Sequence, residues 1–233
     1  MNILSIDTSN QTMGIAIVKD GQLAGEYITN VKKNHSVRLM PAIDQLMRDT
    51  ETSPEDLKKI VVAKGPGSFT GIRIGLSTAK TMAWALKIPV VAVSSLEAVA
   101  YQGSFFDQLI CPFFDARRGL VYTGVYRWNA SGELEHIEEE KNIMLTELLD
   151  KLAQQKSSVL FLSQDIELHR DVITQTMGDK AIIPESSHHV PRPSLLAQVG
   201  ADKDADELHT LTPNYLRLAE AEANWLKQQQ GKD

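Results

Sequence analysis

Apolar residues recur at strand spacing over the first thirty positions. The runs 3–6, 13–18 and 23–28 are rich in Ile, Leu and Val, and the polar segments 8–12 and 20–21 separate them. This pattern predicts three antiparallel strands. From His35 to Arg48 the period changes, because Val37, Met40 and Ile43 recur at helical spacing. We therefore expect a helix there, followed by a loop over residues 49–55.

A strand, a turn, a helix and a second strand follow between Val61 and Val93. The β-branched run breaks at the glycine-rich segment 64–67, a pattern of small residues typical of a helix covers 68–86, and the next strand begins after Pro89. Such a unit builds a parallel sheet. Ser68 or Thr70 would cap the helix. Its N-terminus would then face an anion or the backbone of a partner.

The opening arrangement recurs in the second half of the chain. The run Leu109–Asp115 ends in an aspartate, as does Ile3–Asp7, and a turn and a strand over 120–128 follow it. Asp7 and Asp115 are thus equivalent positions. We further expect a glutamate-rich strand or loop, helices over 145–154, 165–177 and 194–200, and strands over 159–162 and 181–184. The prediction is two lobes, residues 1–101 and 102–212, with a last helix over 213–230 returning to the first lobe.

Composition limits the environment and the partners. The chain has 233 residues, 42% of them hydrophobic, and a formal net charge of −6. That charge repels a phosphate backbone, so we do not expect the chain to bind nucleic acid by itself. The single cysteine, Cys111, lies in an apolar run and predicts a buried thiol in a reducing compartment, the cytoplasm. We see no targeting segment, and no apolar run approaches the ~20 residues of a membrane span.

Five motifs carry a resemblance to a known family. They are ILSIDTS at 3–9, KGPGSFTGIRIG at 64–75, VSSLE at 93–97, FDARR at 114–118 and PNYLR at 213–217. Together they are similar to the TsaB family, also called YeaZ, a group of non-catalytic paralogues of TsaD within the actin, hexokinase and Hsp70 (ASKHA) superfamily. The resemblance implies a two-lobed, actin-like α/β fold of the ribonuclease H-like type, with mixed sheets and flanking helices.

The same resemblance implies a function. TsaB proteins support the formation of threonylcarbamoyladenosine (t6A) at adenosine 37 of tRNAs that read codons beginning with A. TsaD transfers the threonylcarbamoyl group, and the ATPase TsaE completes the complex. ATP and a metal ion would be used by TsaD and TsaE, no cofactor is expected on this chain alone, and tRNA would be reached only through the complex. The family is also grouped by ancestry with M22 glycoproteases.

The expected absence of catalysis depends on two positions. The sister enzyme's motif places two metal-binding histidines at i and i+4 of one helix, and the matching residues here are Ser95 and Val99. Valine cannot bind a metal, and the six histidines are scattered, so we predict no metal site and no catalytic residues. The alternatives are an M22-type peptidase or an ATP-dependent phosphotransferase using Asp7, Asp115 and Glu97, and a structural dimer unrelated to tRNA.

Superfamily members hold phosphates between two glycine-containing hairpins. Here bulkier residues replace those glycines, in Asp7–Asn10 and in Asp115–Gly119, and the expected adenosine loop at 162–166 lacks a glycine pair. A kinase-like ATP site is therefore expected to be degraded. A vestigial nucleotide or anion site would comprise Asp7, Ser9, Asp115, Arg117 and Arg118. The two arginines would contact an anion or pair with acids at the lobe junction.

Two helices of the first lobe offer a candidate interface. Their apolar residues form either an ordinary core stripe or a subunit surface. The resemblance favours a surface used both for a homodimer and, in exchange, for TsaD. The predicted interface residues are Leu39, Met40, Ile43, Leu46, Met47, Ile72, Leu76, Ala79 and Met82.

Overall fold

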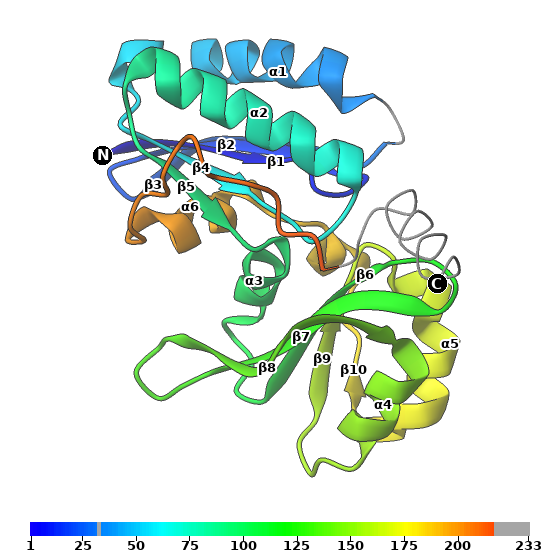
Figure 1. The fold of residues 1–233 in the computed structure, drawn as a ribbon. Helices are drawn as coiled ribbons and strands as arrows, with labels where there is room; N and C mark the ends of the chain where they lie inside the picture. Colours follow the sequence, from blue (N-terminus) through cyan, green and yellow to red (C-terminus); the bar gives the residue numbers. More distant parts are fainter. Residues whose placement is uncertain (32–33, 217–233) are drawn as a thin grey trace, which may run out of the picture.

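A computed structural model describes residues 1–31 and 34–216 and consists of two lobes, each built on a five-stranded mixed sheet (Figure 1). The first sheet contains β1 (Asn2–Asp7), β2 (Met13–Lys19), β3 (Gln22–Thr29), β4 (Lys59–Ala63) and β5 (Val90–Val93), in the order β3-β2-β1-β4-β5. The second contains β6 (Leu109–Asp115), β7 (Leu120–Trp128), β8 (Leu134–Met144), β9 (Val159–Leu162) and β10 (Ala181–Ile182), in the order β8-β7-β6-β9-β10. The repeated order confirms the predicted duplication and the two-lobed α/β fold.

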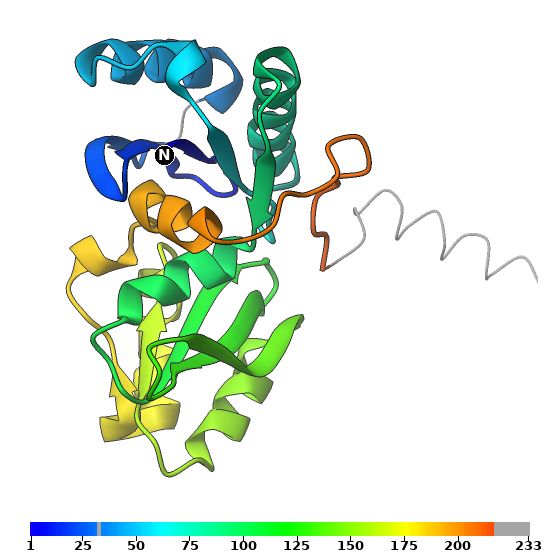
Figure 2. The same cartoon turned by 90° about the vertical axis from the view of Figure 1, so that its left-hand side faces the viewer.

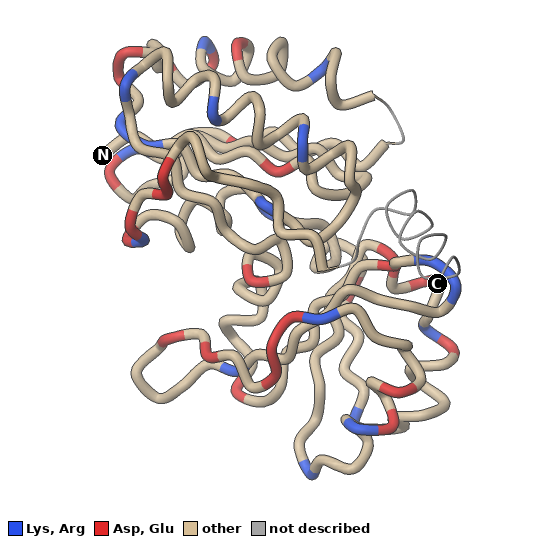
Figure 3. Tube along the Cα trace, in the orientation of Figure 1, with Lys and Arg blue, Asp and Glu red and all other residues tan. Residues whose placement is uncertain are grey.

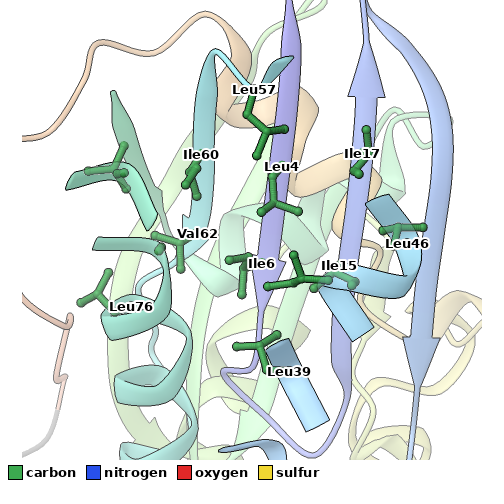
Figure 4. Packing of buried hydrophobic residues seen from close by; sticks show 14 of the residues in the cluster. Leu4, Ile6, Ile15, Ile17, Leu39, Leu46, Leu57, Ile60, Val62 and Leu76 are labelled. Carbon is green, nitrogen blue, oxygen red and sulfur yellow. The ribbon is translucent and has the colours of Figure 1, made fainter. Parts of the chain in front are cut away.

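Helices α1 (His35–Asp49) and α2 (Phe69–Leu86) cover one face of the first sheet (Figures 1 and 2). Both begin at a capping side chain: Asn34 Oδ1 accepts from the backbone N–H of Ser36, and Ser68 Oγ from that of Gly71. Their apolar stripes pack on the sheet. Figure 4 shows Leu39, Leu46 and Leu76 directed at the strand residues, and all three are buried.

The opposite face of the first sheet is covered by α6 (Pro193–Ala201). Leu196 and Ala197 pack against Ile3 and Val61, and a Cβ at Gly200 would lie 2.4 Å from a Val61 methyl group. The structure thus places residues 193–212 with the first lobe, which corrects the boundary predicted at 212. The physical reason is that the β-branched outer face of the sheet needs an apolar cover, and α6 supplies it.

The second lobe packs α4 (Leu145–Ala153) and α5 (Ile166–Met177) against its sheet. The short α3 (Ser95–Ala100) lies between the lobes: Leu96 and Val99 contact the second sheet, whereas Ala98 belongs to the cluster under α6. Short 3-10 turns are η1 (Pro54–Asp56), η2 (Tyr101–Gly103), η3 (Gly178–Lys180) and η4 (Ser186–His189).

The structure shortens or leaves undescribed two elements predicted for the second half of the chain. Residues 213–216 are not helical, and the remainder of the predicted helix 213–230 lies outside the described residues. The predicted strand 181–184 is shorter, since β10 ends at Ile182. Within residues 1–31 and 34–216, no helix has the length and apolar character that crossing a membrane requires.

Candidate functional site

A cleft of about 550 Å³ lies between the lobes. Asn10, Gln11 and the start of α2 line it from the first lobe, and the turn after β6 lines it from the second. Gln164 and Asp165, in the predicted adenosine loop, also face it. The cleft therefore brings together the two hairpin turns that the sequence singles out.

On the first-lobe side, Asp7 and Ser9 are buried and do not line the cleft. Asp7 Oδ1 accepts hydrogen bonds from the Ser9 backbone N–H at 2.8 Å and from Ser9 Oγ at 2.7 Å. Burial raises the pKa of Asp7 above its usual value. The two hydrogen bonds from Ser9 act in the opposite direction, but the effect of burial is larger. The structure thus separates Asp7 and Ser9 from the other residues of the predicted anion site.

The glycine-rich loop packs on this same turn. Ser68 N–H donates to the Ser9 carbonyl at 2.6 Å, and a Cβ at Gly67 would lie 2.2 Å from that oxygen. A Cβ at Gly71 would lie 2.1 Å from the Thr8 carbonyl oxygen. Both positions need glycine, because any side chain there would clash with the backbone of residues 8–9. One N–H of this loop thus binds the chain's own hairpin, while the start of α2 also lines the cleft; anion binding there stays a prediction.

On the second-lobe side, Asp115 is held by its neighbours. His169 Nε2 lies 3.0 Å from Asp115 Oδ1, the Arg117 N–H donates to Oδ2 at 3.2 Å, and the Asp115 N–H donates to Asp165 Oδ2 at 2.9 Å. Burial is the main cause that raises the pKa of Asp165. Two carboxyl groups, Asp115 and Asp165, thus line this side of the cleft, and His169 contacts Asp115 from behind the lining residues.

The exposed residues Arg117 and Arg118 line the cleft beside them. Their backbones adopt φ values of 65° and 57°, and Gly119 follows at 76°. Consecutive residues with positive φ are the backbone geometry of a tight hairpin turn, here the turn between the antiparallel strands β6 and β7. The structure brings Asp115, Arg117 and Arg118 together as predicted; whether they bind an anion stays a prediction.

The positions that match the sister enzyme's histidines are enclosed. Ser95 is 0% exposed and its Oγ has no hydrogen-bond partner, while Val99 is 1% exposed within an apolar cluster. Glu97 pairs with Lys203 at 2.6 Å. In the part of the chain that the structure describes, no three His, Cys, Asp or Glu side chains are grouped as metal ligands.

The predicted interface needs correction. Seven of its residues are buried in the core of the first lobe: Leu39, Ile43, Leu46, Met47, Ile72, Leu76 and Ala79. Met82 is partly buried, and only Met40, at 48%, is exposed. Because the apolar stripe of each helix faces the sheet, these residues form core rather than surface.

A different set of side chains faces outward on the same helices. We define the outer face as Val37, Met40, Ser77, Thr81 and Trp84, all of which are exposed. Val37 and Trp84 are each 67% exposed. Along α2 only Arg73 and Lys80 are charged, and charges are few along this helix (Figure 3). The sequence pattern missed this face, because it placed Val37 on one stripe with Met40 and Ile43, of which only Ile43 is buried.

Comparison with known proteins agrees with this architecture. Residues 23–225 match the sequence model of TsaD, tRNA N6-adenosine threonylcarbamoyltransferase. Two solved structures from Pseudomonas aeruginosa share the fold: a protein with similarity to peptidase YeaZ (TM-score 0.77, 22% identity, covering 93% of this chain and 99% of that one) and YeaZ (TM-score 0.76, 22% identity, covering 92% and 99%). The class is thus a two-lobed α/β protein with a duplicated mixed sheet.

Two curated relatives make the assignment specific. The tRNA threonylcarbamoyladenosine biosynthesis protein TsaB of Bacillus subtilis is 53% identical over 98% of this chain and 100% of its own length. TsaB of Escherichia coli is 31% identical over 67% and 68%. The chain belongs to the TsaB family.

Proposed function

We propose that this protein takes part in threonylcarbamoyladenosine formation on tRNA as the non-catalytic partner subunit that binds and activates TsaD. The part in tRNA modification is supported by the names of the B. subtilis and E. coli relatives. The docking role is supported by the outer face of α1 and α2. Its exposed apolar and aromatic side chains, on an α2 helix that carries few charges, are typical of the centre of a protein interface.

The proposal that the subunit is not the catalyst is supported by the enclosed positions of α3. An open, polar face would be needed to hold a catalytic ion, whereas Ser95 is fully buried and Val99 is buried against the second sheet. TsaD would then supply the transferase chemistry and TsaE the ATPase, tRNA would be reached through the complex, and the cytoplasm is the proposed compartment.

One outer face cannot serve two partners at once. If the same side chains mediate self-association, homodimer and TsaD complex exclude each other, and their balance depends on concentration and relative affinity. Activation follows if the docked subunit binds the active lobe arrangement of TsaD more tightly than the idle one.

Light scattering after size exclusion tests the docking role. The isolated chain should elute as a dimer, and addition of TsaD should convert it to a complex containing one copy of each. A homodimer that persists beside unbound TsaD at micromolar concentrations would contradict the proposal.

The alternative of an M22-type peptidase or a phosphotransferase has one observation in its favour: Asp115 and Asp165 line the cleft together, and His169 contacts Asp115. Calorimetric titration with ATP and Mg²⁺, followed by turnover assays on the isolated chain, separates the two functions. Sustained turnover that Asp115→Asn abolishes would favour the alternative.

A further inference from the structure

The segment 211–216, which we call the strap, lines the cleft with its last three residues. After α6 the chain covers the free edge of β5, where the Asp206 N–H donates to the Val90 carbonyl at 2.9 Å (Figure 1). Leu211 is then buried in the first core, and the Asn214 N–H donates to the Lys64 carbonyl at 2.8 Å. The strap is therefore hydrogen-bonded to the glycine-rich loop.

Aromatic contacts attach the strap to the start of α2. The Tyr215 ring stacks on Phe69 at 4.9 Å with an interplanar angle of 23°. The Arg73 guanidinium lies 3.8 Å from the centre of the Phe69 ring, and Arg73 Nε donates to Tyr215 Oη at 2.8 Å. Contacts of this kind combine stacking and cation–π attraction.

This cluster continues the outer face. Phe69, Arg73, Ser77 and Thr81 follow one another at four-residue spacing, which places them on one side of α2, and Trp84 follows on the same side. All five are exposed. A partner covering the outer face of α2 would therefore reach the side chains that hold the strap.

The Glu140 carboxylate of the second lobe contacts the strap. Glu140 of β8 accepts from Tyr126 Oη at 2.6 Å, from Ser94 Oγ at the start of α3, and from Asn214 Nδ2 at 3.5 Å. These three donors belong to the second sheet, the inter-lobe helix and the strap. The neighbouring Glu139 is exposed and serves as a matched control.

We propose that the strap couples the two lobes: the Phe69–Arg73–Tyr215 cluster senses occupancy of the outer face, and Asn214 passes that state to Glu140 in the second lobe. The sensing step rests on the proposed docking of TsaD, whereas the attachment of the strap does not. Coupling of this kind requires a contiguous element that both sites bias, and the strap contacts both.

Hydrogen exchange of the Asn214 backbone N–H, measured by mass spectrometry on the full chain, tests the attachment of the strap. Glu140→Ala and Tyr215→Ala should each raise its exchange rate at least tenfold, and Glu139→Ala should change it less than twofold. Tyr215→Phe, which keeps the ring and removes only the bond from Arg73, guards against loss of fold and should give an intermediate rise. Equal exchange in all variants would overturn the proposal.

Addition of TsaD tests the coupling. Binding should slow exchange of the same amide at least tenfold in the natural chain, and less in Glu140→Ala. A complex detected by light scattering without any change in exchange would overturn the coupling alone. Failure to form any complex would overturn the coupling together with the proposed function, while the strap's attachment in the isolated chain would stand.

Discussion

Removal of the Trp84 side chain should weaken TsaD binding strongly while leaving the fold intact. The residue is 67% exposed, and a tryptophan side chain buries at most ~250 Å², so docking would remove ~170 Å² from water. At ~25 cal/mol per Å², this area contributes at most ~4 kcal/mol. Interface tryptophans that act as hot spots contribute about 2–4 kcal/mol, so Trp84→Ala should reduce affinity roughly 30- to 700-fold.

Isothermal titration of TsaD with each variant measures this loss, and thermal unfolding followed by circular dichroism measures the fold. Phe105→Ala is the matched control, because Phe105 is also 67% exposed but follows η2, away from α1 and α2. Its affinity for TsaD should stay within threefold of the natural chain. Equal affinity for Trp84→Ala and Phe105→Ala would refute the placement of the interface on the outer face.

Three further predictions concern buried groups. Ile43→Ala should lower the free energy of unfolding by about 2–5 kcal/mol in urea titrations, because Ile43 is 1% exposed, whereas Met40→Ala should lower it much less. Because Ile43 is a core residue, Ile43→Arg should fail to fold and would not report on docking. Cys111 should resist thiol reagents at pH 8 until the chain unfolds, because burial raises its pKa to about 12. Burial lowers the pKa of His189, so below pH ~6.5 the unfolded state binds a proton that the native state does not bind. The free energy of unfolding should therefore fall as the pH drops below ~6.5, and it should fall less in His189→Gln.

Much of the fold was accessible from the sequence because its signals are local. The strands that end in Asp7 and Asp115, the glycine turn before α2 and the helix starts at Asn34 and Ser68 all follow from residues close in the chain. The position of α6 does not follow from nearby residues. It depends on contacts such as the hydrogen bond from Ser5 Oγ to the Pro193 carbonyl, which joins residues 188 positions apart.

The candidate sites were predicted less well for a related reason. The sequence pattern identified a glycine-rich turn before α2 but not the Thr8–Ser9 backbone against which Gly67 and Gly71 pack. Helical periodicity grouped Val37, Met40 and Ile43 on one face, but the structure exposes the first two and buries the third. A periodic pattern alone does not reveal which of its members a sheet covers. The burial of these residues decides the question, and it directs attention to Val37 and Trp84.

Reconstitution tests the central claim most directly. TsaD, TsaE, tRNA, threonine, bicarbonate and ATP are combined with and without this protein, and threonylcarbamoyladenosine is quantified in the digested tRNA. We expect the modified nucleoside to form only when the protein is present. Equal yield in its absence would contradict the account.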